Sequence, residues 1–134
     1  MKNYNDYIAK ELMDKLFNFG YPLNEISANC INSTRPTYCI TDNRGDSSMY
    51  YVPTYAEIFD WFAIEKSIII SMEPFFTNTI KKHIAYTWKI TYIVDDELKV
   101  IRENDIWNFD DDYGNTFNLT ANDAIKNVLE NPIF

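Results

Sequence analysis

The feature that most constrains the fold is the stretch Ile84–Val94, in which side chains alternate with a period of two. One face of an extended chain would carry the larger apolar groups, which are Ile84, Tyr86, Trp88, Ile90, Tyr92 and Val94. This period is typical of a β-strand with one buried face, and the β-branched and aromatic residues favour the same structure. In a helix, the same side chains would be scattered around the surface. The stretch is therefore predicted to be the central strand of an antiparallel sheet.

Two further elements are predicted before residue 53. Apolar residues at helical spacing predict an N-terminal helix over residues 5–19, which Gly20 would end. Two strand-like runs flank turn-forming residues between Asp42 and Asp46, and this pattern predicts a β-hairpin over residues 37–52.

The strongest helix start in the chain is at Thr54 and Glu57, which have the spacing of a capping box. The helix that begins there is expected to end near Lys66 and to bury Trp61 and Phe62 against the sheet.

The remaining elements complete the predicted fold. A strand over Ser67–Met72 would end at Pro74, and another over Leu98–Arg102 would follow the central strand. A last helix would be capped by Thr120 or Asn122. The order is then α-ββ-α-βββ-α, in which residues 54–131 form an α-βββ-α unit. We predict a single α+β domain over residues 1–134, with an antiparallel sheet of about four to six strands and helices mainly on one face.

The composition limits the classes of partner. The 134 residues include 46% apolar and 16% aromatic side chains, as expected for a globular protein. Because 20 acidic residues outnumber 12 basic ones, the net charge is −8, which argues against binding to nucleic acid or to anionic membranes. Cys30 and Cys39 make no disulfide framework, and no apolar signal or membrane segment is found, so a cytoplasmic location is expected.

No catalytic or metal-binding constellation stands out. His83 is the only histidine and there are 3 glycines, so neither a histidine-rich zinc site nor a glycine-rich phosphate loop is present. A calcium loop that starts at Asn108 fails, because Tyr113 takes the glycine position and Leu119 the glutamate position. We therefore expect no enzyme activity and no cofactor. An irregular cation site and a nucleophilic pair of Cys30 or Cys39 with His83 remain as alternatives.

The α-βββ-α order is also that of double-stranded RNA-binding domains. These domains use a basic start of the last helix, but residues 118–123 contain no Lys or Arg. RNA binding is therefore not expected.

Two sets of residues are candidates for binding. The first is an acidic and aromatic loop that suits contact with a protein, because aromatic side chains dominate interface energetics. Its members are Asp105, Trp107, Phe109, Asp110, Asp111, Asp112 and Tyr113. In the alternative, this loop only packs its rings on the core. The second set, for a nucleotide or another small ligand bound by a homo-oligomer, is Lys81, Lys82, His83 and Arg102.

One pattern of motifs resembles a known group of proteins. The motifs are Pro53–Phe62, Tyr86-x-Trp88-x-Ile90, Asp111-Asp112-Tyr113 and Ala121–Leu129. Over residues 50–131 the chain resembles small uncharacterised proteins of gut Bacteroidetes and of their phages and prophages, although it departs from them at Ala63-Ile64. The resemblance implies a phage or prophage accessory protein and brings no activity with it.

These observations favour a non-enzymatic interaction protein that binds a host or phage protein, for example as an inhibitor of a host defence system. Two alternatives are a small-ligand or nucleotide-binding oligomer and a virion or structural component.

Overall fold

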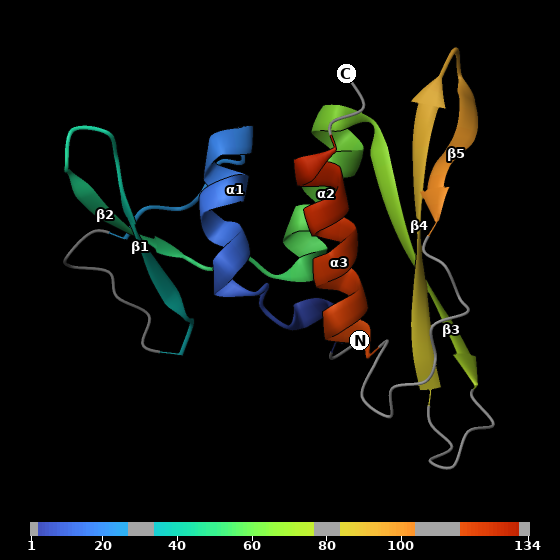
Figure 1. Cartoon of the computed structure of the whole chain (residues 1–134), viewed down its shortest axis with the longest axis horizontal. Helices are drawn as coiled ribbons and strands as arrows, with labels where there is room; N and C mark the ends of the chain where they lie inside the picture. The colour runs from blue at the N-terminus through green and yellow to red at the C-terminus, as the bar shows by residue number, and fades with distance from the viewer. Residues whose placement is uncertain (1–2, 27–33, 77–83, 104–115, 132–134) are drawn as a thin grey trace.

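The structure, a computed structural model, describes residues 3–26, 34–76, 84–103 and 116–131, which hold three α-helices and five strands. In chain order, these are α1 (Met13–Phe19), β1 (Thr37–Thr41), β2 (Ser47–Tyr51), α2 (Tyr55–Lys66), β3 (Ile68–Phe76), β4 (Ile84–Val94), β5 (Glu97–Glu103) and α3 (Phe117–Glu130). The predicted α+β class and the predicted order of elements are confirmed. Figure 1 shows the β1–β2 hairpin at one end of the molecule, the helices in the middle and the other three strands at the opposite end.

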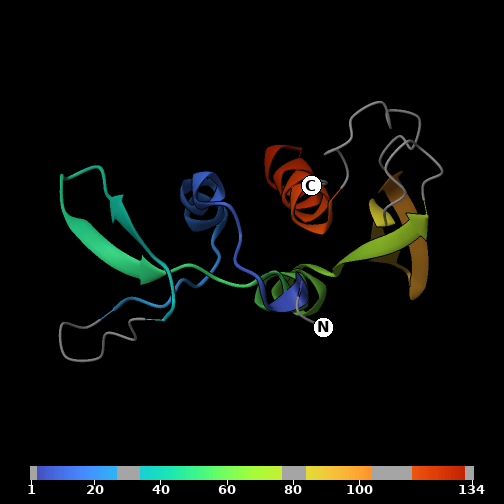
Figure 2. The ribbon, with the colours of Figure 1, turned by 90° about the horizontal axis from the view of Figure 1, so that it is seen from below.

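The stretch with period-two alternation forms β4, the middle strand of an antiparallel sheet with the order β3-β4-β5. Trp88 and Ile90 are buried, while Tyr86 and Tyr92 pack against the core, so the predicted central strand and its apolar face are confirmed. Only Ile84, at the start of the strand, is exposed among the larger apolar groups of that face. Helices α2 and α3 lie against this face (Figure 2).

The five strands are divided between two sheets instead of being joined in one. β1 and β2 form a separate antiparallel pair. The outer edge of β2 is occupied by residues 24–26, because the Tyr51 amide donates to the Asn24 carbonyl at 3.0 Å and the Ile26 amide donates to the Met49 carbonyl at 2.9 Å. The hairpin packs on α1, which separates it from α2 and α3 (Figure 2). The hairpin therefore has a packing partner of its own.

The predicted N-terminal helix begins later than residue 5. Tyr7 forms an antiparallel bridge with Thr54 at the start of α2. On either side of this bridge, the Ile8 amide donates to the Pro53 carbonyl at 3.1 Å and the Tyr55 amide donates to the Asp6 carbonyl at 3.1 Å. These long-range bonds replace the helical ones, so helical structure starts at Lys10 with a 3-10 turn and continues as α1. A second 3-10 turn lies at Asn3–Asn5.

The capping box at the start of α2 is present as predicted. The Glu57 amide donates to the Thr54 hydroxyl at 3.2 Å, and the Thr54 amide donates to the Glu57 carboxylate at 3.4 Å. The same carboxylate accepts from the Arg35 guanidinium at 2.6 Å, which joins the base of the hairpin to α2. Phe62 is fully buried, but the prediction for Trp61 is wrong, because its ring packs against Phe19 and Tyr21 near the end of α1.

The prediction that Pro74 ends a strand is also wrong. β3 continues to Phe76, and Pro74 pairs in register with Tyr86 of β4. β3 is an edge strand of its sheet, and an edge strand tolerates proline where the missing N–H would face away from the neighbouring strand.

Helix α3 starts at Phe117 with Thr116 as its N-cap, before either predicted cap. Thr120 and Asn122 lie inside the helix and bind other elements: the Thr120 hydroxyl donates to the Tyr86 carbonyl at 3.3 Å. The Asn122 side-chain oxygen accepts from the Tyr55 hydroxyl at 3.1 Å and from the Ala9 amide at 3.2 Å. One turn of this helix therefore holds the sheet, α2 and the N-terminal segment together.

Candidate functional site

A groove with a volume of about 540 Å³ opens between α1 and β1. Its walls are built from two segments that lie far apart in the sequence. Its lining residues are Asp14, Phe17 and Asn18 of α1, and Tyr38, Cys39, Ile40, Thr41, Asp42 and Asn43 of the hairpin. One wall is thus a helix face and the other is a strand with its edge.

The backbone of β1 has an unpaired edge along this groove. Hydrogen bonds from Val52 to Pro36 (3.0 Å) and from Asp42 to Asp46 (2.8 Å) fix which cross-strand pairs are hydrogen-bonded. In an antiparallel ladder such pairs alternate with pairs whose N–H and C=O groups point outward. Thr37, Cys39 and Thr41 therefore direct their backbone groups away from β2, and these groups have no backbone partner in the described parts of the chain.

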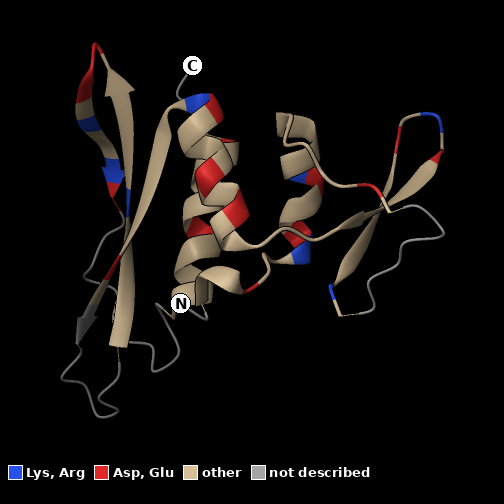
Figure 3. Ribbon diagram, turned by 180° about the vertical axis from the view of Figure 1, so that it is seen from behind, with Lys and Arg blue, Asp and Glu red and all other residues tan. Residues whose placement is uncertain are grey.

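The other strand edges in the described parts of the chain carry features that oppose pairing with another chain. The edge strand β3 contains Glu73 and Pro74. The edge strand β5 carries charges at Glu97, Lys99, Arg102 and Glu103, and its register with β4 is shifted between Ile90 and Thr91. Figure 3 shows these charges along β5, whereas the β1 strand has none. Charged residues, proline and bulges are the usual protections of a sheet edge, so the edge of β1 is the one left open to a further strand.

The groove has an acidic character. Among the residues that the structure describes, Asp14 and Asp42 line it, and no Lys or Arg does. An oxygen of Asp14 accepts a hydrogen bond from the Tyr38 hydroxyl at 3.0 Å, and this bond raises the pKa of Tyr38 above its ordinary value. One oxygen of Asp42 accepts from the backbone amides of Arg44 (2.8 Å) and Asp46 (2.9 Å), which orders the hairpin turn. The carboxylates are therefore held in place at both ends of β1.

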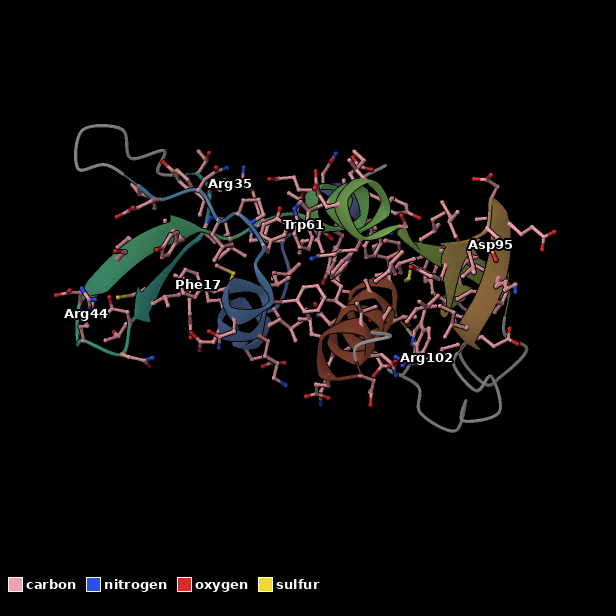
Figure 4. The ribbon with its side chains drawn as sticks, turned by 90° about the horizontal axis from the view of Figure 1, so that it is seen from above. Phe17, Arg35, Arg44, Trp61, Asp95 and Arg102 are labelled. Atoms are coloured by element: carbon pink, nitrogen blue, oxygen red, sulfur yellow. The ribbon has the colours of Figure 1, made fainter. Side chains whose placement is uncertain are left out.

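The groove also offers apolar surface. Phe17 is 39% exposed, and its ring contacts that of Tyr50 with centroids 5.8 Å apart. Figure 4 shows Phe17 between α1 and the hairpin. Ile40, beside the open edge, is buried. A bound segment would thus meet backbone hydrogen-bonding groups, two carboxylates and an exposed aromatic ring.

The candidate residues taken from the sequence are placed differently. The acidic and aromatic set Asp105, Trp107, Phe109, Asp110, Asp111, Asp112 and Tyr113 lies outside the described residues, and so do Lys81, Lys82 and His83. Arg102 is described: its Nη1 donates to the side-chain oxygen of Asn127 at 2.8 Å and to the carbonyl of the same residue at 3.3 Å. These contacts to α3 give Arg102 a structural role, and Figure 4 shows its side chain on the side of the sheet next to α3.

The groove was not anticipated from the sequence. The available signal is the run Thr37–Thr41, a strand pattern without any charge, compared with the charged run Glu97–Glu103. Such a contrast indicates which edge strand is unprotected, but it does not show that α1 lies beside it.

The described lining of the groove contains one cysteine, Cys39, and no histidine. Cys39 is exposed and not disulfide-bonded, and Cys30 lies outside the described residues. Across the described ranges, no group of three or more His, Cys, Asp or Glu side chains could hold a metal ion. Within the same ranges, no helix has the length and apolar character needed to cross a membrane.

Comparisons with known proteins bring no family to this chain: no family model, no curated protein and no solved structure matches it.

Proposed function

We propose that the protein is a non-enzymatic binding module that takes up an extended segment of another protein by strand addition to β1. The open edge of β1 carries this proposal, because Thr37, Cys39 and Thr41 direct N–H and C=O groups away from β2, and these groups have no backbone partner within the described residues. Cys39 and Thr41 also line the groove. Strand addition is an established mode of peptide recognition, in which main-chain hydrogen bonds supply affinity and alternate side chains supply specificity.

The size of the open edge suits a short segment. Three outward-facing residues can exchange several hydrogen bonds with an added strand, and each is worth a net ~0.5–1.5 kcal/mol. The contacts that the segment makes with the α1 wall add to this. The resemblance noted above suggests a host or phage protein as the source of the segment.

The small-ligand alternative gains no support from this groove. Its described lining has two carboxylates and no cation, a charge distribution that would repel a nucleotide phosphate.

Selection from a displayed library of random peptides, followed by two variants of one residue, tests the proposal. Cys39→Pro removes an outward N–H from the edge without removing a bond to β2, while Cys39→Ser keeps the N–H and serves as the matched control. We expect selected peptides to bind the wild-type protein and Cys39→Ser equally and to lose at least tenfold in affinity with Cys39→Pro.

Peptide chemistry provides a readout that does not depend on the folding of Cys39→Pro. N-methylation of alternate peptide residues should abolish binding for one parity and leave the other unchanged, as the ladder of an antiparallel or parallel pair requires. A library without binders, or binders that tolerate N-methylation at either parity, would refute strand addition.

A further inference from the structure

We propose that the segment bound by β1 is cationic, with a Lys or Arg on each side of an apolar residue in the order cation-x-apolar-x-cation. This inference rests on the proposed function and names the class of its partner. It depends on three residues of one hairpin face and on the helix above them.

The side chains of β1 that point toward α1 are fixed by the alternation of the strand. Side chains of a strand alternate between its faces, so Tyr38, Ile40 and Asp42 share one face. This is the face toward α1, since the Tyr38 hydroxyl bonds to Asp14 and Tyr50, the cross-strand neighbour of Tyr38, contacts Phe17. The ladder bond between the Asp42 amide and the Asp46 carbonyl extends the strand geometry as far as Asp42.

The side chains of an added strand that lie opposite Tyr38, Ile40 and Asp42 would point to the same face, toward α1. Residues directly opposite each other on neighbouring strands have Cβ atoms about 4.5–5.5 Å apart and share a face. The residues opposite Tyr38, Ile40 and Asp42 would therefore be every second residue of the bound segment. The first and last of these residues lie four positions apart along the segment, which is a distance of about 13 Å in a strand.

The carboxylates of the groove favour cationic side chains at both ends of the bound segment. The position opposite Tyr38 lies beside Asp14, and the last position lies beside Asp42, so both ends favour a cation, while the middle position meets the apolar side chain of Ile40. The cations on the neighbouring elements do not fill this role: Lys15 pairs with Glu130 of α3, and Arg44 lies at the hairpin tip (Figure 4). The whole chain has a net charge of −8, which favours the approach of a basic segment.

Fluorescence anisotropy with three synthetic heptapeptides tests the inference. All have Thr at the odd positions and Val at the centre; the second and sixth positions are Lys in one peptide, Gln in the next and Glu in the last. We expect the Lys peptide to bind at least tenfold more tightly than the Gln peptide, the Glu peptide to be weakest, and the difference to shrink as salt is raised.

Two matched variants locate the charge effect. Asp14→Asn keeps an acceptor for the Tyr38 hydroxyl but removes the charge, so it should weaken the Lys peptide about tenfold and leave the Gln peptide unchanged. Asp60→Asn, an exposed carboxylate of α2 outside the groove lining, should change neither.

The outcomes separate this inference from the proposed function. Equal binding of the Lys and Gln peptides, with loss of both in Cys39→Pro, would overturn the cationic partner and leave strand addition in place. If none of the three peptides binds, the cationic motif is also overturned. Strand addition is then tested separately by the library selection. A dimer in sedimentation experiments that Cys39→Pro abolishes would assign the edge to a second copy of the chain and overturn the inference.

Discussion

The interaction between Asn122 and Tyr55 allows a quantitative test of the fold. Tyr55 is 1% exposed, and its hydroxyl donates to the Asn122 side chain at 3.1 Å, with a longer contact of 3.4 Å to the Asn118 carbonyl. The same Asn122 oxygen accepts from the Ala9 amide at 3.2 Å. Asn122→Ala therefore removes the acceptor of two donors from different elements.

The expected cost follows from those two donors. A hydrogen bond contributes a net ~1 kcal/mol, and a buried polar group left without a partner costs about 1–3 kcal/mol. Both donors are only partly compensated after the change, so Asn122→Ala should lower the free energy of unfolding by about 2–4 kcal/mol. Tyr55→Phe removes one donor and leaves the bond to Ala9, so it should cost about 1 kcal/mol.

Urea denaturation at pH 7, followed by circular dichroism, measures these changes through a double-mutant cycle. The double variant should be less destabilised than the sum of the single variants, with a coupling energy of about 1 kcal/mol. Asn118→Ala, one turn earlier on the exposed side of α3, is the matched control and should change stability by less than about 0.5 kcal/mol. A cost below about 0.5 kcal/mol for Asn122→Ala, or strict additivity with Tyr55→Phe, would show that the reasoning is wrong.

Two further predictions concern stability. Thr54→Ala removes the hydroxyl that caps α2 and should cost about 1 kcal/mol in urea denaturation, whereas Thr54→Ser should stay within a few tenths; equal losses would contradict the capping role. Burial raises the pKa of Tyr55 from 10.0 to about 12. As pH rises, the unfolded chain loses the Tyr55 proton before the folded protein does. The contribution of Tyr55 to the free energy of unfolding is therefore complete below pH 10 and is lost between pH 10 and 12, at up to about 1.4 kcal/mol per pH unit. Denaturation at several alkaline pH values should show a shallower fall for Tyr55→Phe, and an unchanged slope would argue against a raised pKa.

The sequence predicted correctly those elements whose signals lie within a few neighbouring residues. The alternation from Ile84 to Val94 identified the central strand because one face of it is covered, and the Thr54–Glu57 spacing identified the start of α2 because both partners lie in one turn. The turn formers between Asp42 and Asp46 likewise placed the hairpin, whose turn is ordered by the Asp42 side chain.

Long-range bonds explain the errors. Ile8 fits a helical pattern, yet its amide donates to the Pro53 carbonyl, far along the chain, and Tyr7 forms a β-bridge with Thr54. Thr120 and Asn122 have side chains typical of helix caps, but their partners are Tyr86, Tyr55 and Ala9. The groove was missed for the same reason, since its two walls, at 14–18 and 38–43, meet only in the folded chain.

The position of α3 has a consequence for biosynthesis. This helix is the last described element to leave the ribosome, yet it supplies acceptors for Trp88 of β4, for Arg102 of β5 and for the Ala9 amide 113 positions earlier. Until α3 emerges, α2 is the one described helix that would cover the apolar face of the β3-β4-β5 sheet, so the nascent chain would expose the part of that face that α3 covers. Folding is therefore expected to end with the docking of α3, which forms its contacts with β4, β5 and the N-terminal segment in one late step.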